Sequence, residues 1–323
     1  MGYTTKYGEL NYVSDLTRYP NGNLKDCTIE DKIEINTDYG VLIPQYEFTN
    51  HRKKYISSLS FFENGTIRRI ALNEQMIVNT PIGKRKAELI TFYECGAMKR
   101  LFPLNGHLTA YWEEEDEYQL ATEDSYDLSC GNIVTKAISV YFYKNGTVKS
   151  LTLWPREIVQ IQTPLGGMAV RIGISFYADG SIQSIEPATH TLIHSPIGSL
   201  IAYDENVNGI LGDQNSLIFT KEGELLALAT SNQKVIAKNI HTKEEITFSP
   251  HQELDDDQEE VWFHPLKIEF EEGYIRFNEG NRLEINQYEF KIKPYRKSGI
   301  NPCANCASCN GCNMEQRLEG FNA

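Results

Sequence analysis

Four cysteines near the C-terminus are the residues whose type and spacing could do chemistry. Cys303, Cys306, Cys309 and Cys312 follow one another at intervals of three, and only Ala, Asn, Ser and Gly stand between them. Thiolates are soft ligands for zinc, copper or iron–sulfur clusters, and small spacers let the backbone wrap closely around a metal. The spacing therefore predicts a metal–thiolate site made by these four side chains.

The identity of the metal has two main alternatives. The first three cysteines resemble the Cys-x2-Cys-x2-Cys run of bacterial-type ferredoxins, and this resemblance implies a [4Fe-4S] cluster. Cys312 departs from that pattern, because it follows after two residues instead of three and precedes Asn313 instead of Pro. A remote thiol, Cys27, Cys95 or Cys130, could then complete the cluster. Zinc is the alternative cofactor, although zinc sites usually separate their cysteine pairs by a longer loop. A metal-free tail with labile thiols is the third possibility.

No catalytic motif accompanies the cysteines. The seven histidines are scattered, and only His190 and His194 are near neighbours, for which ordinary surface positions are the favoured interpretation. The sequence has no Gly-x-Ser-x-Gly, Walker A, His-Glu-x-x-His or dinucleotide-binding motif. We expect that the protein is not an enzyme. An enzyme that works at the metal centre is the alternative.

Composition restricts the partners and the compartment. The 323 residues include 41% hydrophobic and 23% charged residues, which is typical of a folded globular chain. The formal net charge of -13 disfavours nucleic acid and anionic membranes and favours a protein partner, either a redox enzyme or a basic surface. There is no apolar run of signal-peptide or membrane-spanning type, and seven cysteines make a poor disulfide framework, so we expect a cytoplasmic protein.

Two short phrases recur along the chain. The first is an aromatic strand followed by a tight turn ending in Gly, at 61–67, 92–98, 142–148, 176–182, 219–225, more weakly at 270–275, with an early copy at 19–24. Each predicts a β-hairpin, and Asn-Gly or Asp-Gly favours a type I′ turn. Ile67 and Ile70 are three apart, which indicates a bulge or a strand that changes faces. The second phrase, Thr-Pro-x-Gly or a close variant at 37–40, 80–83, 163–166 and 195–198, predicts the opposite corners.

The phrases combine into an internal duplication of about 57–112 and 138–204. The aromatic-aromatic-x-Asn-Gly-x-Ile phrases resemble MORN-type repeats, especially the antitoxin-like bacterial variant, over roughly 19–228. This resemblance implies a scaffold or binding surface that is not itself catalytic. The inserted corners and irregular repeat lengths put a regular single-sheet groove in doubt. A β-sandwich with similar turns is the alternative fold.

We therefore expect an all-β fold of tandem β-hairpin repeats, forming a meandering or solenoid-like sheet with an irregular Cys-rich tail. The expected domains are a repeat domain at 1–250, a terminal β cap at 251–300 and a metal-binding tail at 301–323. The acidic runs at 113–117 and 255–260 are expected as solvated loops, with a cation site or a docking patch as alternatives. The expected function is a non-catalytic scaffold that presents a [4Fe-4S] cluster for electron transfer to, or assembly or regulation of, a partner redox protein. The alternative is a protein–protein interaction module whose tail binds zinc or is passive.

Overall fold

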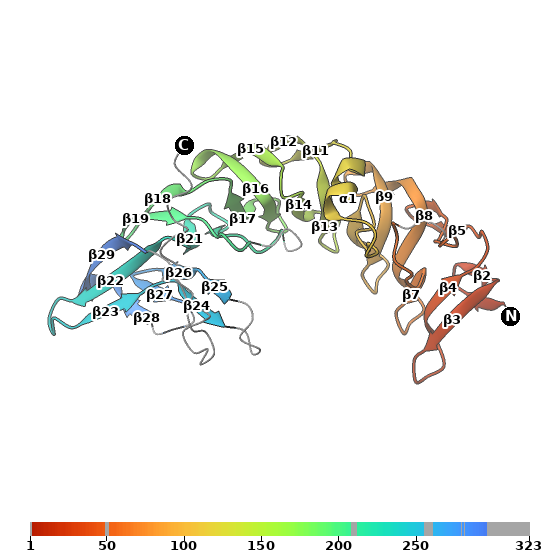
Figure 1. Ribbon diagram of the computed structural model, residues 1–323, viewed down its shortest axis with the longest axis horizontal. Helices are drawn as coiled ribbons and strands as arrows, with labels where there is room; N and C mark the ends of the chain where they lie inside the picture. The colour runs from red at the N-terminus through yellow and green to blue at the C-terminus, as the bar shows by residue number, and fades with distance from the viewer. Residues whose placement is uncertain are drawn as a thin grey trace, which may run out of the picture.

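Antiparallel β-structure dominates the chain. The computed structural model describes residues 2–48, 52–207, 212–254, 261–278, 280 and 282–295. Within these ranges the strands are joined by one short helix, α1 (Glu114–Leu120), and one 3-10 turn, η1 (Ile285–Gln287). The molecule is an arch, with β3 and β4 at one end and β22, β23 and β29 at the other (Figure 1). The predicted all-β class is confirmed.

One meandering sheet of 16 strands runs through the arch, and every neighbouring pair in it is antiparallel. Spatial order follows chain order, so the predicted meander is confirmed. From one edge to the other the strands are β3 (Val13–Arg18), β4 (Leu24–Ile29), β7 (Leu59–Phe61), β8 (Ile67–Thr80), β9 (Gly83–Phe92), β10 (Met98–Phe102), β13 (Ala137–Phe142), β14 (Val148–Leu153), β16 (Gly166–Phe176), β17 (Ile182–Pro187), β20 (Leu217–Phe219), β21 (Leu225–Thr230), β26 (Leu266–Glu271), β27 (Tyr274–Phe277) and β28 (Arg282–Glu284), with β15 (Ile158–Thr163) paired to β16 beside this path.

A single row of apolar side chains fixes the register of this sheet. Each member pairs directly with the next one across the strands, and each is at most 2% exposed. A slip of one residue would turn a strand's apolar residues to the wrong face, so this row holds the pairing in place. We call it the apolar ladder, and it comprises Cys27, Leu59, Ile70, Ile90, Leu101, Val140, Leu151, Ile174, Ile185, Leu217, Leu228, Ile268 and Phe277.

A second layer of short hairpins covers the ladder. Its residues share one continuous core with the ladder, among them Ile35, Tyr126, Ile193 and Val235. β11, β12, β15, β18 and β19 lie along the outer side of the arch (Figure 1). The second layer consists of β5 (Ile35–Thr37) with β6 (Gly40–Leu42), β11 (Asp124–Leu128) with β12 (Gly131–Thr135), β18 (Thr191–Ser195) with β19 (Gly198–Ala202), the outer parts of the β8–β9 and β15–β16 hairpins, and the sheet of β22 (Gln233–Asn239), β23 (Glu245–Phe248) and β29 (Tyr288–Pro294). A further hairpin, β1 (Tyr3–Thr5) with β2 (Gly8–Leu10), precedes them.

The hairpin tips of the main sheet correct the predicted turn type. Gly65 adopts φ 77°, whereas Asn64 is absent from the residues with positive φ, and a type I′ turn needs positive φ at both central positions. Gly65 N donates to Phe62 O at 2.8 Å, and Phe62 N donates to Thr66 O at 2.7 Å. The tip is thus a tight turn followed by a left-handed glycine, an arrangement that carries a bulge. The type I′ prediction is wrong.

The bulge explains the spacing of three between buried residues. Phe61 pairs with Ile67 and Ser60 pairs with Arg69, so the residue between, Arg68, is left out of the ladder of pairs. Ile67 and Ile70 can therefore both be buried, at 2% and 0% exposure. Of the two interpretations of this spacing, the bulge is confirmed.

Tyrosine hydroxyls link four of the tips to the next hairpin. Tyr143 donates its hydroxyl to the carbonyl oxygen of Phe176 at 2.9 Å. Tyr19, Tyr93 and Tyr177 make the same bond to the carbonyl oxygens of Phe61, Phe142 and Phe219 at 2.8–2.9 Å. These bonds join hairpins that are neighbours in the sheet but separated by 33 to 49 residues in sequence.

The opposite corners also share one design. Thr80 Oγ1 donates to Gly83 O at 2.6 Å and accepts from Ile82 N at 3.2 Å. The same two contacts occur at Thr37, Thr163 and Ser195, as predicted, and at Thr5, which the sequence phrase did not include. The hydroxyl thus satisfies a backbone donor and an acceptor in each corner.

The predicted strands after residue 260 are present. They are β25 (Val261–His264), β26, β27 and β29, and β24 (His251–Leu254) pairs with β25. β26 pairs with β21, so the main sheet continues into this region. The domain boundaries and the internal duplication stay predictions, and the tail at 301–323 lies outside the described residues.

Candidate functional site

The four cysteines of the predicted metal site, Cys303, Cys306, Cys309 and Cys312, all lie outside the described residues. Of the three remote thiols, Cys27 and Cys130 are buried and Cys95 is exposed. Burial raises the pKa of Cys27 to about 12 and that of Cys130 to about 11, so both thiols are protonated at neutral pH. Cys95 is therefore the one of these three that is best placed to reach a metal.

Long connecting segments lie on the face of the sheet opposite the ladder. Leu89 precedes Ile90 of the ladder and Phe102 follows Leu101, and successive residues of a strand point to opposite faces. The described parts of these segments are 43–48 and 52–58, 103–123, and 203–207 and 212–216, and the second segment contains α1. A cluster of charged side chains fastens two of these segments to the sheet.

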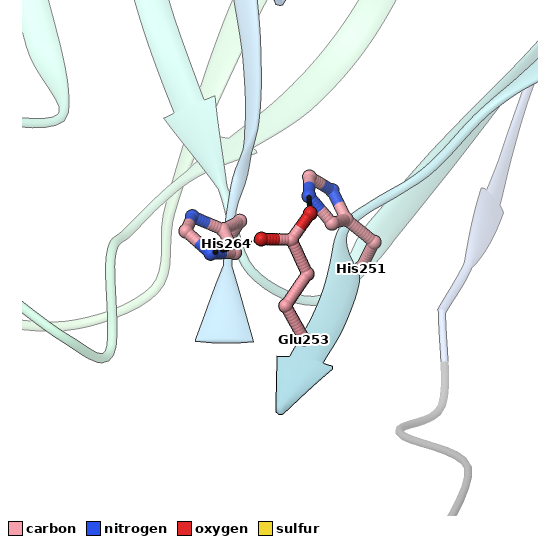
Figure 2. A group of neighbouring side chains, drawn as sticks. All are labelled: His251, Glu253 and His264. Atoms are coloured by element: carbon pink, nitrogen blue, oxygen red, sulfur yellow. Dashed lines mark ion pairs between the residues drawn. The ribbon is translucent and has the colours of Figure 1, made fainter. Parts of the chain in front are cut away.

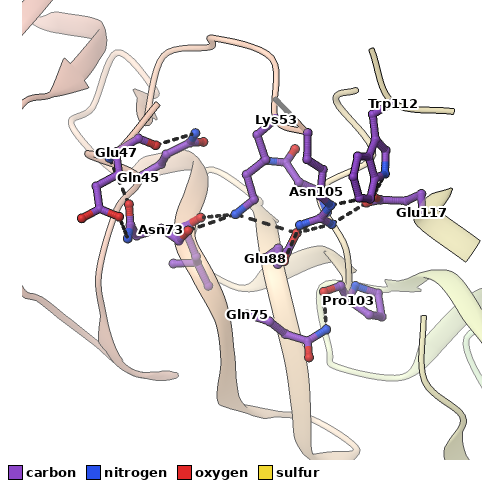
Figure 3. A network of polar contacts seen from close by, with 12 residues as sticks. Gln45, Glu47, Lys53, Asn73, Gln75, Glu88, Pro103, Asn105, Trp112 and Glu117 are labelled. Atoms are coloured by element: carbon purple, nitrogen blue, oxygen red, sulfur yellow. Dashed lines mark hydrogen bonds and ion pairs between the residues drawn. The ribbon is translucent and has the colours of Figure 1, made fainter. Parts of the chain in front are cut away.

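Arg52 is the centre of that cluster, and Figure 3 shows the side chains of Glu88, Glu117 and Lys53 around it. Its guanidinium donates from Nη1 and Nη2 to the two carboxylate oxygens of Glu88 on β9, at 3.0 and 2.9 Å. It also donates from Nε and Nη2 to Glu117 on α1, at 2.6 and 2.5 Å. Lys53 Nζ lies 3.9 Å from Glu88 Oε2, so two cations face two carboxylates. Such a pair of bidentate contacts positions α1 against the sheet.

The environment of these charges differs from the expectation for the acidic run at 113–117. Glu117 is 1% exposed, and Trp112 Nε1 donates to its carboxylate at 3.2 Å. Most of the run forms the first turn of α1, where the helix dipole favours acidic residues. Burial lowers the pKa of Lys53, whereas for Arg52 the two carboxylates outweigh burial and raise the pKa. The prediction of a solvated loop is therefore wrong here; the corresponding run at 255–260 lies outside the described residues.

A cleft of about 900 Å³ opens beside this cluster. Glu117 contributes to its wall, together with residues of β9, β10, β13 and β16 and of the segments at 104–108 and 205–207. Its size is that of ligand sites in general, which are mostly apolar with a few well-placed polar groups. Among the apolar lining residues are Leu89, Phe102, Leu104, Ala137, Ile138 and Trp154.

Two buried polar side chains in the wall have no hydrogen-bond partner among the residues that the structure describes. Asn105 is 4% exposed, and neither its Oδ1 nor its Nδ2 is hydrogen-bonded. Trp154 is 6% exposed, and its indole Nε1 is likewise unpaired. More than nine in ten buried polar groups are paired, and leaving one unpaired costs about 1–3 kcal/mol. One acceptor and two donor groups are thus left unpaired in residues that line the cleft.

Backbone strain is a third feature of the cleft. Ile172 lines it and adopts φ 62°, in the left-handed region, which a β-branched residue rarely enters. The pairing of β16 is interrupted next to it, between Arg171 and Ile174. Strain of this kind costs about 1–3 kcal/mol and gathers at binding sites. These features define the cleft as the candidate functional site.

A second group of functional side chains lies on the β24–β25 hairpin. His251, Glu253 and His264 come together there, although neither histidine belongs to the neighbouring pair His190 and His194 noted in the sequence (Figure 2). The sequence signal was His-x-Glu on one strand with a histidine on the next strand. It becomes visible only once His251 is paired with His264.

Comparisons with family models, curated proteins and solved structures gave no significant match for this chain. Across the described residues, no helix has both the length and the apolar character that crossing a membrane requires.

Proposed function

We propose that this protein is a non-catalytic, cytoplasmic scaffold built from tandem hairpin repeats, which binds an extended segment of a partner protein in the cleft. The observation that carries the proposal is that the amide of Asn105 and the indole of Trp154, both in residues that line the cleft, are unpaired within the described part of the chain. The MORN-like phrases support the same class of protein, since they imply a binding surface.

A peptide segment fits the chemistry of the wall. The Asn105 side chain offers one acceptor and one donor group, the complement of the N–H and C=O that an extended backbone presents. Trp154 Nε1 can donate to a further carbonyl oxygen. Apolar lining residues accept alternate side chains, and Glu114 and Glu205 at the wall, with a chain net charge of -13, favour a segment that carries basic residues.

Selection of short random peptides displayed on phage against the full-length protein tests this function. We expect enriched peptides with apolar and basic residues. Because each lost bond is worth about 1 kcal/mol, their affinity should fall about thirtyfold in Asn105→Leu, which loses two bonds, and about fivefold in Trp154→Phe, which loses one. Asn105→Leu should also raise the stability of the free protein by about 1 kcal/mol, since it removes unpaired buried groups.

Trp112→Phe is the matched control for this experiment. It removes an indole donor that is already bonded to Glu117, so it should lower stability without lowering peptide affinity. Selected peptides that bind both cleft variants as tightly as the parent protein would refute the peptide-binding function. Enrichment of no peptide would do the same.

The second candidate function is a scaffold that presents a [4Fe-4S] cluster for electron transfer to, or assembly or regulation of, a redox partner, and the spacing of Cys303, Cys306, Cys309 and Cys312 favours it. Purification without oxygen should give a brown protein whose iron and sulfide disappear in a variant with all four cysteines changed to Ser. Bound zinc without iron would instead support the interaction module with a zinc-binding tail, and a colourless, metal-free protein would refute both metal alternatives.

A further inference from the structure

We propose that His251, Glu253 and His264 form a binding site for a divalent cation of the zinc class, separate from the cysteine tail and from the cleft. The three ligand atoms lie within 4.8 Å of one another. The carboxylate of Glu253 points toward both imidazole rings, and Figure 2 marks its two ion pairs with dashed lines. The proposal is independent of the function proposed above.

The hairpin register brings the three side chains to one face. His251 pairs directly with His264 across the strands, and residues two apart on a strand, such as His251 and Glu253, point the same way. The two rings stack with centroids 4.8 Å apart. Because neighbouring backbone hydrogen bonds hold both strands, the ligands are placed by the sheet instead of by a loop.

The distances fit a tetrahedral centre. His251 Nε2 lies 3.3 Å from Glu253 Oε1, and His264 Nε2 lies 3.5 Å from Glu253 Oε2. Bonds of about 2.1 Å from zinc to nitrogen and oxygen place neighbouring ligands of a tetrahedron about 3.4 Å apart. The two histidine nitrogens need only a side-chain rotation to reach the same distance, and their side chains are 48% and 44% exposed, which leaves them room to turn.

The ligand set selects the class of cation. Imidazole nitrogen suits zinc, cobalt, nickel and copper, whereas calcium and magnesium take all-oxygen sites. Each histidine must offer the lone pair of Nε2, so a proton on that nitrogen leaves to solvent or is replaced by one on Nδ1 when the metal binds. Three protein ligands leave a fourth position open to water or to a partner's side chain.

The sequence around the site also favours a cation. Residues 255–260, which connect β24 to β25, contain five carboxylates among six positions. A local excess of negative charge raises the concentration of cations near it. This negative charge attracts any divalent cation. The preference for cations of the zinc class therefore comes from the two histidines.

Titration of the full-length protein with Co²⁺ and Zn²⁺ tests the site. All proteins in this experiment carry Ser at 303, 306, 309 and 312, so that thiolates of the tail cannot bind the metal. We expect visible cobalt bands without sulfur charge transfer, and displacement of cobalt by zinc. His251→Ala, His264→Ala and Glu253→Gln should each weaken zinc binding at least tenfold. Mg²⁺ at the same concentration should not displace cobalt.

His194→Ala is the matched control, because it removes an exposed histidine on β18 that contacts Ser199 and should leave the affinity unchanged. A second measurement follows the imidazole resonances of all seven histidines while zinc is added. The resonances of His251 and His264 should shift together. Unchanged affinity in His251→Ala and His264→Ala, or resonance shifts at other histidines, would overturn the proposal.

Discussion

Burial separates Cys27 and Cys130 from Cys95 in chemical reactivity. The two buried thiols have raised pKa values of about 12 and about 11, and only the thiolate form of cysteine reacts rapidly with electrophiles. Cys95 lies at a hairpin tip and is exposed.

We expect iodoacetamide at about pH 8 to modify Cys95 in the native protein and to leave Cys27 and Cys130 unmodified. Peptide mapping by mass spectrometry distinguishes these sites from the cysteines of the tail. All of them should react in urea, which serves as the control. Rapid native labelling of Cys27 would contradict its burial in the apolar ladder.

Glu186 is a buried carboxylate that no sequence motif singles out. It is 0% exposed and accepts hydrogen bonds from Ser216 N at 2.8 Å and Asp204 N at 3.1 Å. Arg171 lies 3.5 Å away. Burial raises the pKa of Glu186 above 4.5, although the hydrogen bonds and Arg171 oppose the shift. The carboxylate therefore links Asp204 and Ser216 to the sheet at a cost in free energy that depends on pH.

Glu186→Gln should remove that pH dependence. Because the folded pKa is raised, the native state holds its proton more tightly than the unfolded state, so this contribution to stability is present below about pH 4.5 and is lost as pH rises through the folded pKa. The stability of the parent protein minus that of the variant should thus fall as pH rises from about 4.5 through the folded pKa, by at most 1.4 kcal/mol per pH unit. Urea midpoints measure it, and parallel pH profiles would contradict the expectation.

The hydrogen bonds from tyrosine hydroxyls to the next hairpin can be tested one hairpin at a time. Tyr143→Phe removes the bond to Phe176 and should cost about 0.5–1.5 kcal/mol. Phe62 occupies the same position in its own hairpin, so Phe62→Tyr should gain the missing bond to the carbonyl oxygen of Phe92 and stabilise the protein by a similar amount. Urea denaturation measures both changes.

Tyr12→Phe provides the control for these substitutions, because Tyr12 is 64% exposed and lies away from the hairpin tips. It should shift the urea midpoint very little. Destabilisation by Phe62→Tyr would show that the tips do not repeat the same geometry, and it would count against the tandem-repeat interpretation.

The hairpins were predictable from sequence because their turns depend on local residues. A glycine and the Asn or Asp before it determine the conformation of a turn of four residues. The turn type was not predictable in the same way, because the bulge that accompanies it appears only in the pairing of two strands. Corners such as 128–131 were missed because they lack the Pro and Thr of the phrase.

The cleft and the charged cluster beside it could not be predicted, because their parts are distant in sequence. Arg52, Glu88 and Glu117 come from a connecting segment, a strand and a helix, and the acidic run that contains Glu117 has the composition of a solvated loop. Asn105 and Trp154 carry no local signal, since an unpaired buried group is defined by what surrounds it. The His251–His264 pair likewise depends on strand register.

The curvature of the whole molecule has a repeated local cause. A bulge bends its strand and increases the local twist. The main-sheet hairpins place their bulges at the same point after the tip, so the bends add in one direction, in line with the arch of Figure 1. The bulged residues are Lys25, Arg68, Lys99, Lys149, Gln183 and Leu226.

Meander topology also predicts how the molecule responds to damage. Each hairpin of the main sheet pairs only with its neighbours, and in such arrays stability is a sum of unit and nearest-neighbour contributions. Leu151 stands in the middle of the apolar ladder at 0% exposure, between Val140 and Ile174. Truncation of the Leu151 side chain should therefore destabilise the neighbouring strands more than the strands at the ends of the arch.

Leu151→Ala should cost about 2–5 kcal/mol, and hydrogen exchange followed by mass spectrometry should show the loss of protection concentrated in β13, β14 and β16. β3, β4 and β27 should retain most of theirs. Leu59→Ala is the matched substitution nearer the N-terminal end, and it should move the loss to β4, β7 and β8. Equal loss of protection over the whole sheet in both variants would mean that the arch unfolds as one cooperative unit, and the nearest-neighbour description would then fail.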